Sequence, residues 1–537
     1  MKTCNSNKAG FITVSALGLL ASLPGDAKSA KDVQRLDKPN ILVILVDDYG
    51  WMDCSFMGSR LYETPNIDRI ASQGMVFSDG YAACQVSSPS RASLLTGLYT
   101  TRHGVTDWIG DKVGDQWRAL GRQTKLLPAD YSWNLAQEHV TLAEALKPYG
   151  YTSFIAGKWH LGEDVTPEMQ GFDINVGGYA AGSPKGGYFP PYNNPRLPDG
   201  PEGEILPERL ARETASFMED MAEKGEPFFA YLSFYAVHGP IQTTETLWRK
   251  YRNKIDSIGF MPGPGFEIDR RQPVRKYQDN PVYAGLIEMM DNGVGIVLDK
   301  LEELGLDKNT IVVFTGDNGG VVSGDAYSSC QAPLRGGKGR QWEGGLRVPF
   351  VIHTPQMTAR IDCNTPVSGI DIFPTALDYA GAAETVYHDV DGVSLKNLLE
   401  GSKLSSRSLF WHYPHYGNQG GEPSSIIRKG KWKLIYYHES GYSELYNLND
   451  DLGETNPLEK KYPVRAAKLQ KELFRWLEKT NAVMPQKDPL YSEEAEMVYL
   501  KEHNEKALKS QEKTRQKMMQ QNWKPNKDWW GSHQIND

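Results

Sequence analysis

Cysteine is scarce in this chain, and positive charge is not in excess. The 537 residues include five cysteines and no C-x-x-C pair, so no thiolate metal site is indicated. The formal net charge of −8 argues against nucleic acid as a partner, because contacts to phosphates need a basic surface. There is no internal repeat. Hydrophobic residues make up 39% of the chain and charged residues 23%, which is typical of a soluble globular protein.

The N-terminal 30 residues differ from the rest. Lys2 and Lys8 are followed by the apolar run FITVSALGLLASL and by the small residues of DAKSA. This order is typical of a secretory signal peptide, and the run is too short to span a membrane. The alternative is an apolar N-terminus that stays attached. We expect an exported, periplasmic or secreted protein that is cleaved near residue 30. The four cysteines beyond the leader could pair, but the sequence gives no connectivity.

Buried strands alternate with amphipathic helices through the first two thirds of the chain. Continuous apolar runs occur in NILVILVDD, YTSFIAGKWH, FFAYLSFYAVH and NTIVVFTGDNGG, and each ends in polar residues. Helix-like segments such as RLARETASFMEDMAEKG lie between them. This alternation predicts an α/β fold with a large mixed, mostly parallel sheet flanked by helices. Ligands bind such sheets where the strands end at their carboxyl side.

The pattern changes near residue 386. Segments such as SLFWHYPHYG and SSIIRKGKWKLIYYHE predict short strands, followed by a helix near AAKLQKELFRWLEKT. We therefore expect a catalytic domain over 36–385, an α+β subdomain with an antiparallel sheet over 386–484, and a charged extension over 485–537. The extension is interpreted as a solvated helix or a disordered tail, with the tryptophans of WKPNKDWWG as candidates for packing back on the protein.

The segment SSPSRASLLTG, residues 87–97, is unusual for a helix start. Serine can cap a helix and proline suits its first turn, but Arg91 in the first turn opposes the helix dipole. We infer that an anion completes this site.

Acidic and amide side chains follow two of the predicted strands. Asp47 and Asp48 end one, and Asp317 and Asn318 end another. Adjacent strand residues point to opposite faces, so the pair can converge on one ion only where the backbone turns. Oxygen ligands of this kind suit a hard divalent cation such as calcium or magnesium. The alternative for DNGG alone is a tight turn.

Cationic side chains follow the same strands. GKWHLG supplies Lys158 and His160, AVHGP supplies His238, and the glycine-rich segment LRGGKGRQWEGGLR supplies Lys338. A single histidine is more often structural than catalytic, and a glycine-rich loop can simply be solvated. Taken together with the acidic residues, however, they predict a site that binds a tetrahedral oxyanion beside a metal.

These motifs in this order resemble the formylglycine-dependent sulfatases of the arylsulfatase A type, within the alkaline phosphatase superfamily. SSPSRASLLTG is similar to their element of Cys or Ser, any residue, Pro-Ser-Arg, three residues, then Leu-Thr-Gly. VDDYG, GKWHLG, VHGP, TGDNGG and DIFPTALDYAG extend the resemblance from about residue 38 to about residue 480. The resemblance implies an alkaline-phosphatase-like α/β domain. It also implies that Ser87 is converted to formylglycine (3-oxoalanine). A sulfatase whose formylglycine derives from serine is of the serine type, which is found among bacterial carbohydrate sulfatases.

The resemblance also assigns roles. One calcium ion per chain would be held by Asp47, Asp48, Asp317, Asn318 and the modified Ser87. Arg91 and Lys158 would orient the aldehyde hydrate and the sulfate, and Lys338 would bind a sulfate oxygen. His160 would assist deprotonation of a hydrate hydroxyl, and His238 would protonate the departing alcohol. A maturation enzyme that generates formylglycine from serine is an implied partner.

The sulfate ester itself is less constrained by the sequence. WHYPHYG places His412 and His415 near the predicted subdomain, and Arg102 and His103 follow the Ser87 helix. We expect these four to contact sugar, which favours exolytic action on a sulfated carbohydrate; an aromatic hairpin that packs the subdomain core is the alternative. Two other functions stay open. One is a phosphate or phosphonate monoester hydrolase of the same superfamily, and the other is a silent glycan-binding protein in which Ser87 stays serine.

Overall fold

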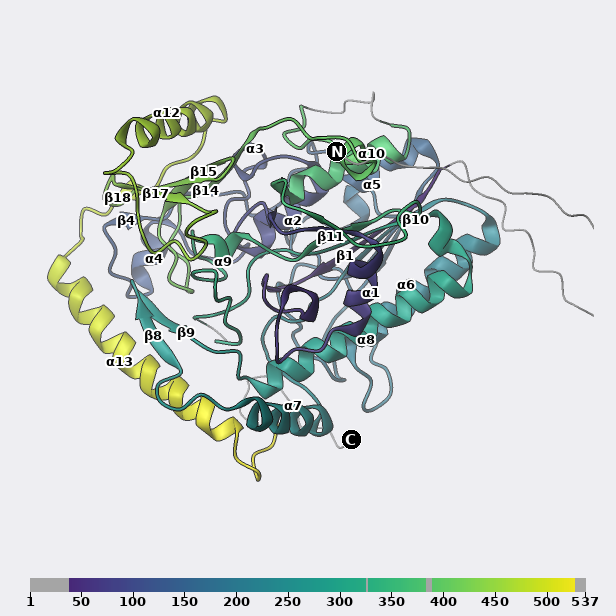
Figure 1. Ribbon diagram of the computed structural model, residues 1–537, viewed down its shortest axis with the longest axis horizontal. Helices are drawn as coiled ribbons and strands as arrows, with labels where there is room; N and C mark the ends of the chain where they lie inside the picture. Colours follow the sequence, from purple (N-terminus) through teal and green to yellow (C-terminus); the bar gives the residue numbers. More distant parts are fainter. Residues whose placement is uncertain (1–37, 325–326, 383–388, 527–537) are drawn as a thin grey trace, which may run out of the picture. The chain divides into compact units, whose positions relative to one another are not determined.

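The computed structural model describes residues 38–324, 327–382 and 389–526 (Figure 1). The predicted signal peptide lies outside these residues. Within them, no helix has both the length and the apolar character needed to cross a bilayer. The four cysteines they include, Cys54, Cys84, Cys330 and Cys363, are free thiols.

The predicted mixed sheet is confirmed as an eight-stranded sheet. Five neighbouring pairs run parallel, and β11, the third strand in the order given next, runs antiparallel to both of its neighbours. In spatial order the strands are β12 (Ile361–Cys363), β2 (Met75–Phe77), β11 (Phe350–His353), β10 (Thr310–Gly316), β1 (Asn40–Val46), β7 (Phe228–Ser233), β5 (Thr152–Gly157) and β6 (Ile174–Val176).

Helices cover both faces of this sheet, which explains why its central strand is apolar throughout. In β1, Leu42, Ile44 and Val46 belong to a core shared with α6 (Leu206–Lys224) and α8 (Pro281–Glu303). The alternate residues of β1 face a second core, shared with α2 (Ser87–Thr96), α5 (Leu142–Leu146) and α10 (Ile372–Tyr379). Figure 1 shows the two groups of helices on opposite sides of the strands. Burial on both faces accounts for the run NILVILV.

The register of the central strands brings their carboxyl ends to one edge. Val46 of β1 pairs with Gly316 of β10, and Leu45 pairs with Ser233 of β7. Ser233 in turn pairs with Gly157 of β5. The residues that follow these four strands therefore leave the sheet at the same place, where a ligand is expected in an open α/β sheet.

The C-terminal region forms the predicted antiparallel sheet. Its strands, in order, are β14 (Ser408–Tyr413), β15 (Ser424–Lys429), β16 (Trp432–Tyr437) and β17 (Ser443–Asn447). Helix α12 (Pro463–Lys479) packs on one face, where Leu469 and Leu473 join Ile427 and Leu434. On the other face, Trp411 and its neighbours pack against residues of the larger sheet's loops.

The remaining elements are short or peripheral. The helices are α1 (Pro65–Gln73), α3 (Thr100–His103), α4 (Gly114–Ala119), α7 (Glu245–Ile258), α9 (Glu343–Leu346) and α11 (Lys396–Leu399). The strands are β3 (Gly80–Tyr81), β4 (Leu126–Leu127), β8 (Phe266–Asp269), β9 (Gln272–Arg275), β13 (Val367–Ser368) and β18 (Gln486–Lys487).

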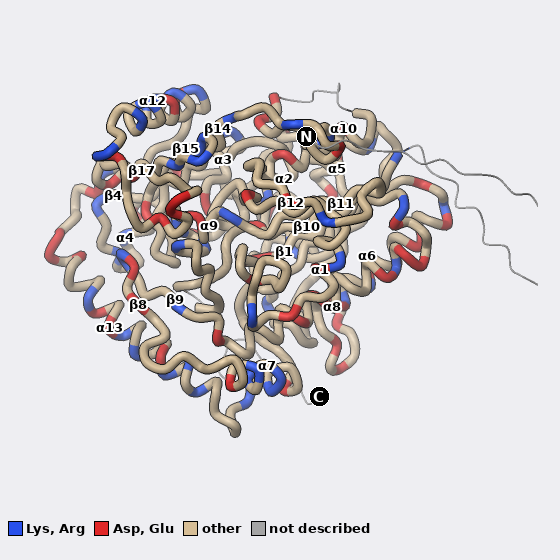
Figure 2. The backbone as a smooth tube through the Cα atoms, in the orientation of Figure 1, with Lys and Arg blue, Asp and Glu red and all other residues tan. Residues whose placement is uncertain are grey.

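The charged extension forms a long helix, α13 (Glu493–Met518), that packs on the rest of the protein. Figure 2 shows Lys and Arg interspersed with Asp and Glu along it, as expected of a helix with one solvated face. Its last turns are anchored: Arg515 is buried and its Nε lies 2.7 Å from Asp279 Oδ2. Trp523, from the predicted docking segment, packs against Trp248 of α7.

Replacing Arg515 with methionine is expected to loosen α13. The change leaves the buried Asp279 carboxylate with Arg275 as its remaining ion-pair partner, at 2.6 Å. We expect a cost of about 2–3 kcal/mol, a Tm lower by about 3 °C, and faster proteolysis of the C-terminal segment. The control is Arg212→Met on α6, because the Arg212 side chain is exposed and its ion pairs are correspondingly weak. Equal Tm and proteolysis rates in the two variants would contradict the anchoring role.

Candidate active site

Helix α2 places Ser87 and Arg91 differently from the capping arrangement expected above. The N-cap is Val86, in extended conformation and without a side-chain cap, so Ser87 is the first helical residue. Arg91 consequently lies in the second turn rather than the first. The helix ends at Gly97, whose φ of 71° is left-handed and whose N–H donates to the Ser93 carbonyl. Ser87 and Arg91 are both buried.

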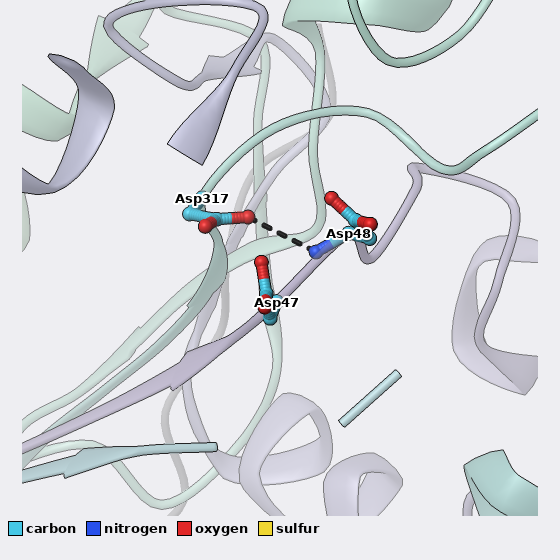
Figure 3. A group of neighbouring side chains, drawn as sticks. All are labelled: Asp47, Asp48 and Asp317. Carbon is cyan, nitrogen blue, oxygen red and sulfur yellow. Dashed lines mark hydrogen bonds between the residues drawn. The ribbon is translucent and has the colours of Figure 1, made fainter. Parts of the chain in front are cut away.

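Three carboxylates converge at the carboxyl edge of the large sheet (Figure 3). Asp47, Asp48 and Asp317 each place one oxygen within 4.8 Å of the others, and all three are buried. The Asp48 backbone has a φ of 59°, so the chain turns directly after β1 and adjacent aspartates reach the same space. The turn is closed by the Asp48 N–H, which donates to Asp317 Oδ1 over 3.0 Å.

Ser87 faces this acidic cluster. Its Oγ donates to Asp47 Oδ1 over 3.0 Å and lies 3.3 Å from Asn318 Oδ1. The Asn318 amide nitrogen donates to Asp48 Oδ1 over 2.9 Å, which fixes the amide oxygen toward Ser87. The structure therefore brings together all five residues that the resemblance assigns to the metal site.

Each carboxylate is paired with a buried cation. Lys158 Nζ lies 2.7 Å from Asp47 Oδ2, Lys338 Nζ lies 2.7 Å from Asp48 Oδ1, and Arg91 Nη2 lies 2.8 Å from Asp317 Oδ2. Burial disfavours the charged form of Asp47, but the Lys158 ammonium outweighs this effect and holds the pKa of Asp47 below its usual value. Lys338 does the same for Asp48 against the effect of burial. Three positive charges thus face three negative ones.

The glycine-rich loop before α9 brings Lys338 into reach. The Lys338 N–H donates to the Gly320 carbonyl over 2.9 Å, so the loop lies directly on the turn that follows Asn318. At Gly337 a Cβ would lie 2.4 Å from the same carbonyl oxygen. Glycine at 337 is therefore required for this close approach.

The two histidines lie beside the cluster in different environments. His238 Nε2 is 3.7 Å from Asp48 Oδ2, and its Nδ1 lies 2.8 Å from the Gly239 carbonyl oxygen. His160 Nε2 lies 3.1 Å from the carbonyl oxygen of Ile109. Burial, reinforced by Lys158, holds the pKa of His160 well below its usual value, so its ring is neutral. Its Nδ1 has no partner among the described residues.

A cavity of about 340 Å³ opens onto this group. Ser87, His160, His238 and Lys338 all line it. Its wall also includes Trp108 and Lys185, which the sequence motifs did not identify because both lie in loops without a recognisable spacing. The other lining residues are Ile109, Gly110, Ala180, Ala181, Gly182, Ser183, Asn418 and Gln419.

None of the four residues expected to contact sugar lines this cavity. His103, His412 and His415 are buried and bond within the protein. Their nitrogens lie 2.9 Å from Ser93 Oγ, 2.7 Å from Ser425 Oγ and 2.9 Å from Thr106 Oγ1, respectively. Arg102 pairs with Asp391 at 3.0 Å and lines a separate cavity of about 920 Å³ beside Trp476. His412 and His415 are packed inside the protein, in keeping with the alternative of an aromatic hairpin that packs the subdomain.

Similarity to known protein families identifies the family of the chain. The family Sulfatase matches residues 39–382, which include every residue of the acidic and cationic groups. The chain belongs to the sulfatase family. A second family, the C-terminal region of N-sulphoglucosamine sulphohydrolase, matches residues 338–482, which include the antiparallel sheet.

Curated relatives agree with this assignment. A sulfatase from Formosa agariphila is 32% identical to this sulfatase over 88% of the chain and 94% of the relative. The N-acetylgalactosamine-6-sulfatase of Mus musculus is 29% identical over 77% of the chain and 74% of the relative. Among solved structures, Ps i-CgsB in complex with k-i-k-neocarrahexaose is 27% identical, with a TM-score of 0.65 over 82% of this chain and 92% of that one. The protein is a sulfuric ester hydrolase.

Proposed function

We propose that this sulfatase removes O-sulfate from carbohydrates exolytically, with Ser87 converted to formylglycine and one calcium ion held beside it. The observation that carries the proposal is the position of Ser87. It lines the cavity, and its Oγ lies 3.0 Å from a carboxylate of the three-aspartate cluster. A reacting group there is open to substrate and adjoins oxygens that suit a cation.

The donor set fits a hard divalent cation. Three carboxylates and the Asn318 amide oxygen are all oxygen donors. Among the described residues, the cluster contains no cysteine or histidine ligand that would favour zinc. When bound, calcium would favour ionisation of a hydroxyl at position 87 and offset negative charge on the sulfate.

Formylglycine explains why a serine stands at this position. Its hydrate would supply two hydroxyls: one for attack on sulfur, with the alcohol oxygen as the leaving group, and one whose loss of a proton would release sulfate as the aldehyde forms again. Serine has one hydroxyl, so a sulfated serine would need a second attack by water. Activity therefore depends on a maturation enzyme that accepts serine and acts before or during export.

The surrounding side chains divide the remaining work. Arg91 and Lys158, which are paired with Asp317 and Asp47 respectively, orient the hydrate and the sulfate. Lys338 lines the cavity and binds a sulfate oxygen. His160 lines the cavity and its Nδ1 has no partner among the described residues, so this nitrogen is assigned the proton of the second hydroxyl. His238 protonates the departing alcohol oxygen.

A carbohydrate substrate is supported by the cavity and by the relatives. Trp108 in the cavity wall offers an aromatic surface of the kind on which sugar rings pack. The mouse relative is named for a sulfated amino sugar, and the structure of Ps i-CgsB holds an oligosaccharide.

The proposal is tested with protein from a host that matures serine. Peptide mass spectrometry is expected to show residue 87 lacking two hydrogens, and metal analysis to show one calcium per chain. Defined sulfated mono- and disaccharides are then assayed beside nitrophenyl sulfate and nitrophenyl phosphate. We expect desulfation of terminal sugars, with kcat/KM higher for sulfate than for phosphate. Unmodified serine in active protein, or a preference for phosphate, would refute the proposal.

A further inference from the structure

One cation in the cavity wall is not used by the chemistry described above. Lys185 lines the cavity and, within the described parts of the chain, makes no hydrogen bond or ion pair. Lys338, the other lysine of the wall, is paired with Asp48 at 2.7 Å. A ligand in the cavity can therefore pair with the Lys185 ammonium without breaking an existing ion pair.

The backbone holds Lys185 in place. It occupies the second position of a turn that the Gly187 N–H closes by donating to the Pro184 carbonyl over 2.9 Å. Pro184 and residues 186–189 are buried, so Lys185 is the exposed residue of an otherwise buried segment. The preceding Gly182 lies against the His160 ring, where a Cβ would approach within 2.5 Å. A fixed turn therefore presents the lysine near the reacting group.

Trp108 is held on the same cavity. Its Nε1–H donates to Asp111 Oδ2 over 3.0 Å, and its ring lies against Gly110, where a Cβ would be 2.6 Å away. Its other contacts are with the buried cluster of Cys84, Val86 and Tyr413. These contacts fix the plane of the indole, as a platform for a sugar ring requires.

We propose that Lys185 and Trp108 form a sugar subsite that selects substrates with a second anionic group: Trp108 packs on the ring, and Lys185 pairs with a carboxylate or a second sulfate. This inference rests on the proposed carbohydrate sulfatase activity. The three buried cations beside Ser87 are each paired with a carboxylate and are assigned to the reacting sulfate, so none of them is left for a second anion. Lys185 supplies that charge at the exposed side of the cavity.

The test compares substrates that carry the same sulfate ester with different neighbours. Three disaccharides are used, in which the second sugar is neutral, carries a uronic carboxylate or carries a second sulfate. We expect the wild-type kcat/KM to be at least about tenfold higher for one or both dianionic substrates than for the neutral one. Which of the two is preferred identifies the anion.

Substitutions then test whether Lys185 causes the preference for dianionic substrates. Lys185→Met is expected to reduce the dianionic-to-neutral ratio about tenfold, and Lys185→Arg to retain most of it, whereas Trp108→Ala should raise KM for all three sugars. The control is Lys308→Met, an exposed lysine at the opposite, amino end of β10. An unchanged ratio in Lys185→Met, or equal rates on all three sugars, would overturn this inference alone. Turnover of nitrophenyl sulfate with none of the sugars would overturn the carbohydrate proposal instead.

Discussion

Replacement of Ser87 by alanine is expected to lower kcat for any sulfate ester by more than about 10⁴-fold. Alanine offers no atom from which formylglycine can form, and it removes the oxygen that lies 3.0 Å from Asp47. The fold should survive, because Ser87 is the first residue of α2 and does not cap it. Steady-state kinetics on nitrophenyl sulfate, with circular dichroism and Tm as folding checks, measure the effect.

Ser93→Ala is the matched control for this variant. Ser93 lies in the same helix and is equally buried, and its Oγ is 2.9 Å from His103 Nε2, outside the cavity. Losing that hydrogen bond should cost about 1 kcal/mol of stability while kcat stays within about threefold. If Ser87→Ala retained wild-type turnover, or if both variants lost activity alike, the role of residue 87 as the reacting group would be wrong.

The large sheet could be predicted because the apolar pattern of each buried strand lies within a short stretch of sequence. A strand covered by helices on both faces must be apolar throughout, and NILVILV has this property in sequence and in the structure. The acidic cluster was predictable for a related reason. Polar residues that directly follow parallel strands share one edge, so Asp47 and Asp317 had to meet once β1 and β10 were neighbours.

The burial of the histidines that were expected to contact sugar could not be predicted, because it depends on distant parts of the chain. His412 is enclosed partly by Val483, whose carbonyl oxygen lies 2.9 Å from its Nε2 and which is 71 residues away. The pattern WHYPHYG is the same whether these rings face solvent or the core. Conversely, Trp108 and Lys185 reach the cavity through loops, where no periodicity signals the direction of a side chain.

Asp317 is expected to be the acidic residue whose replacement has the largest effect, because both of its carboxylate oxygens are engaged within the site. One oxygen accepts the Asp48 N–H at 3.0 Å, and the other is 2.8 Å from Arg91 Nη2. Burial and the neighbouring Asp47 raise the pKa of Asp317, so its negative charge depends on the opposing effect of the cations beside it, Arg91 and Lys158. Asp317→Asn keeps the shape but removes one negative charge from the site and leaves Arg91 with a weaker partner.

We expect Asp317→Asn to bind calcium at least about 100-fold more weakly and to lose more than about 10³-fold in kcat. Metal content after dialysis and calcium titration followed by Tm give the first result independently of activity. Asp291→Asn is the control: this carboxylate is also buried, but it accepts the Asn66 and Ile67 N–H groups at the start of α1. That variant should lower Tm while keeping one calcium per chain. Asp291→Asn removes a buried charge outside the acidic cluster. Equal calcium retention in the two variants would therefore show that Asp317 is not a ligand.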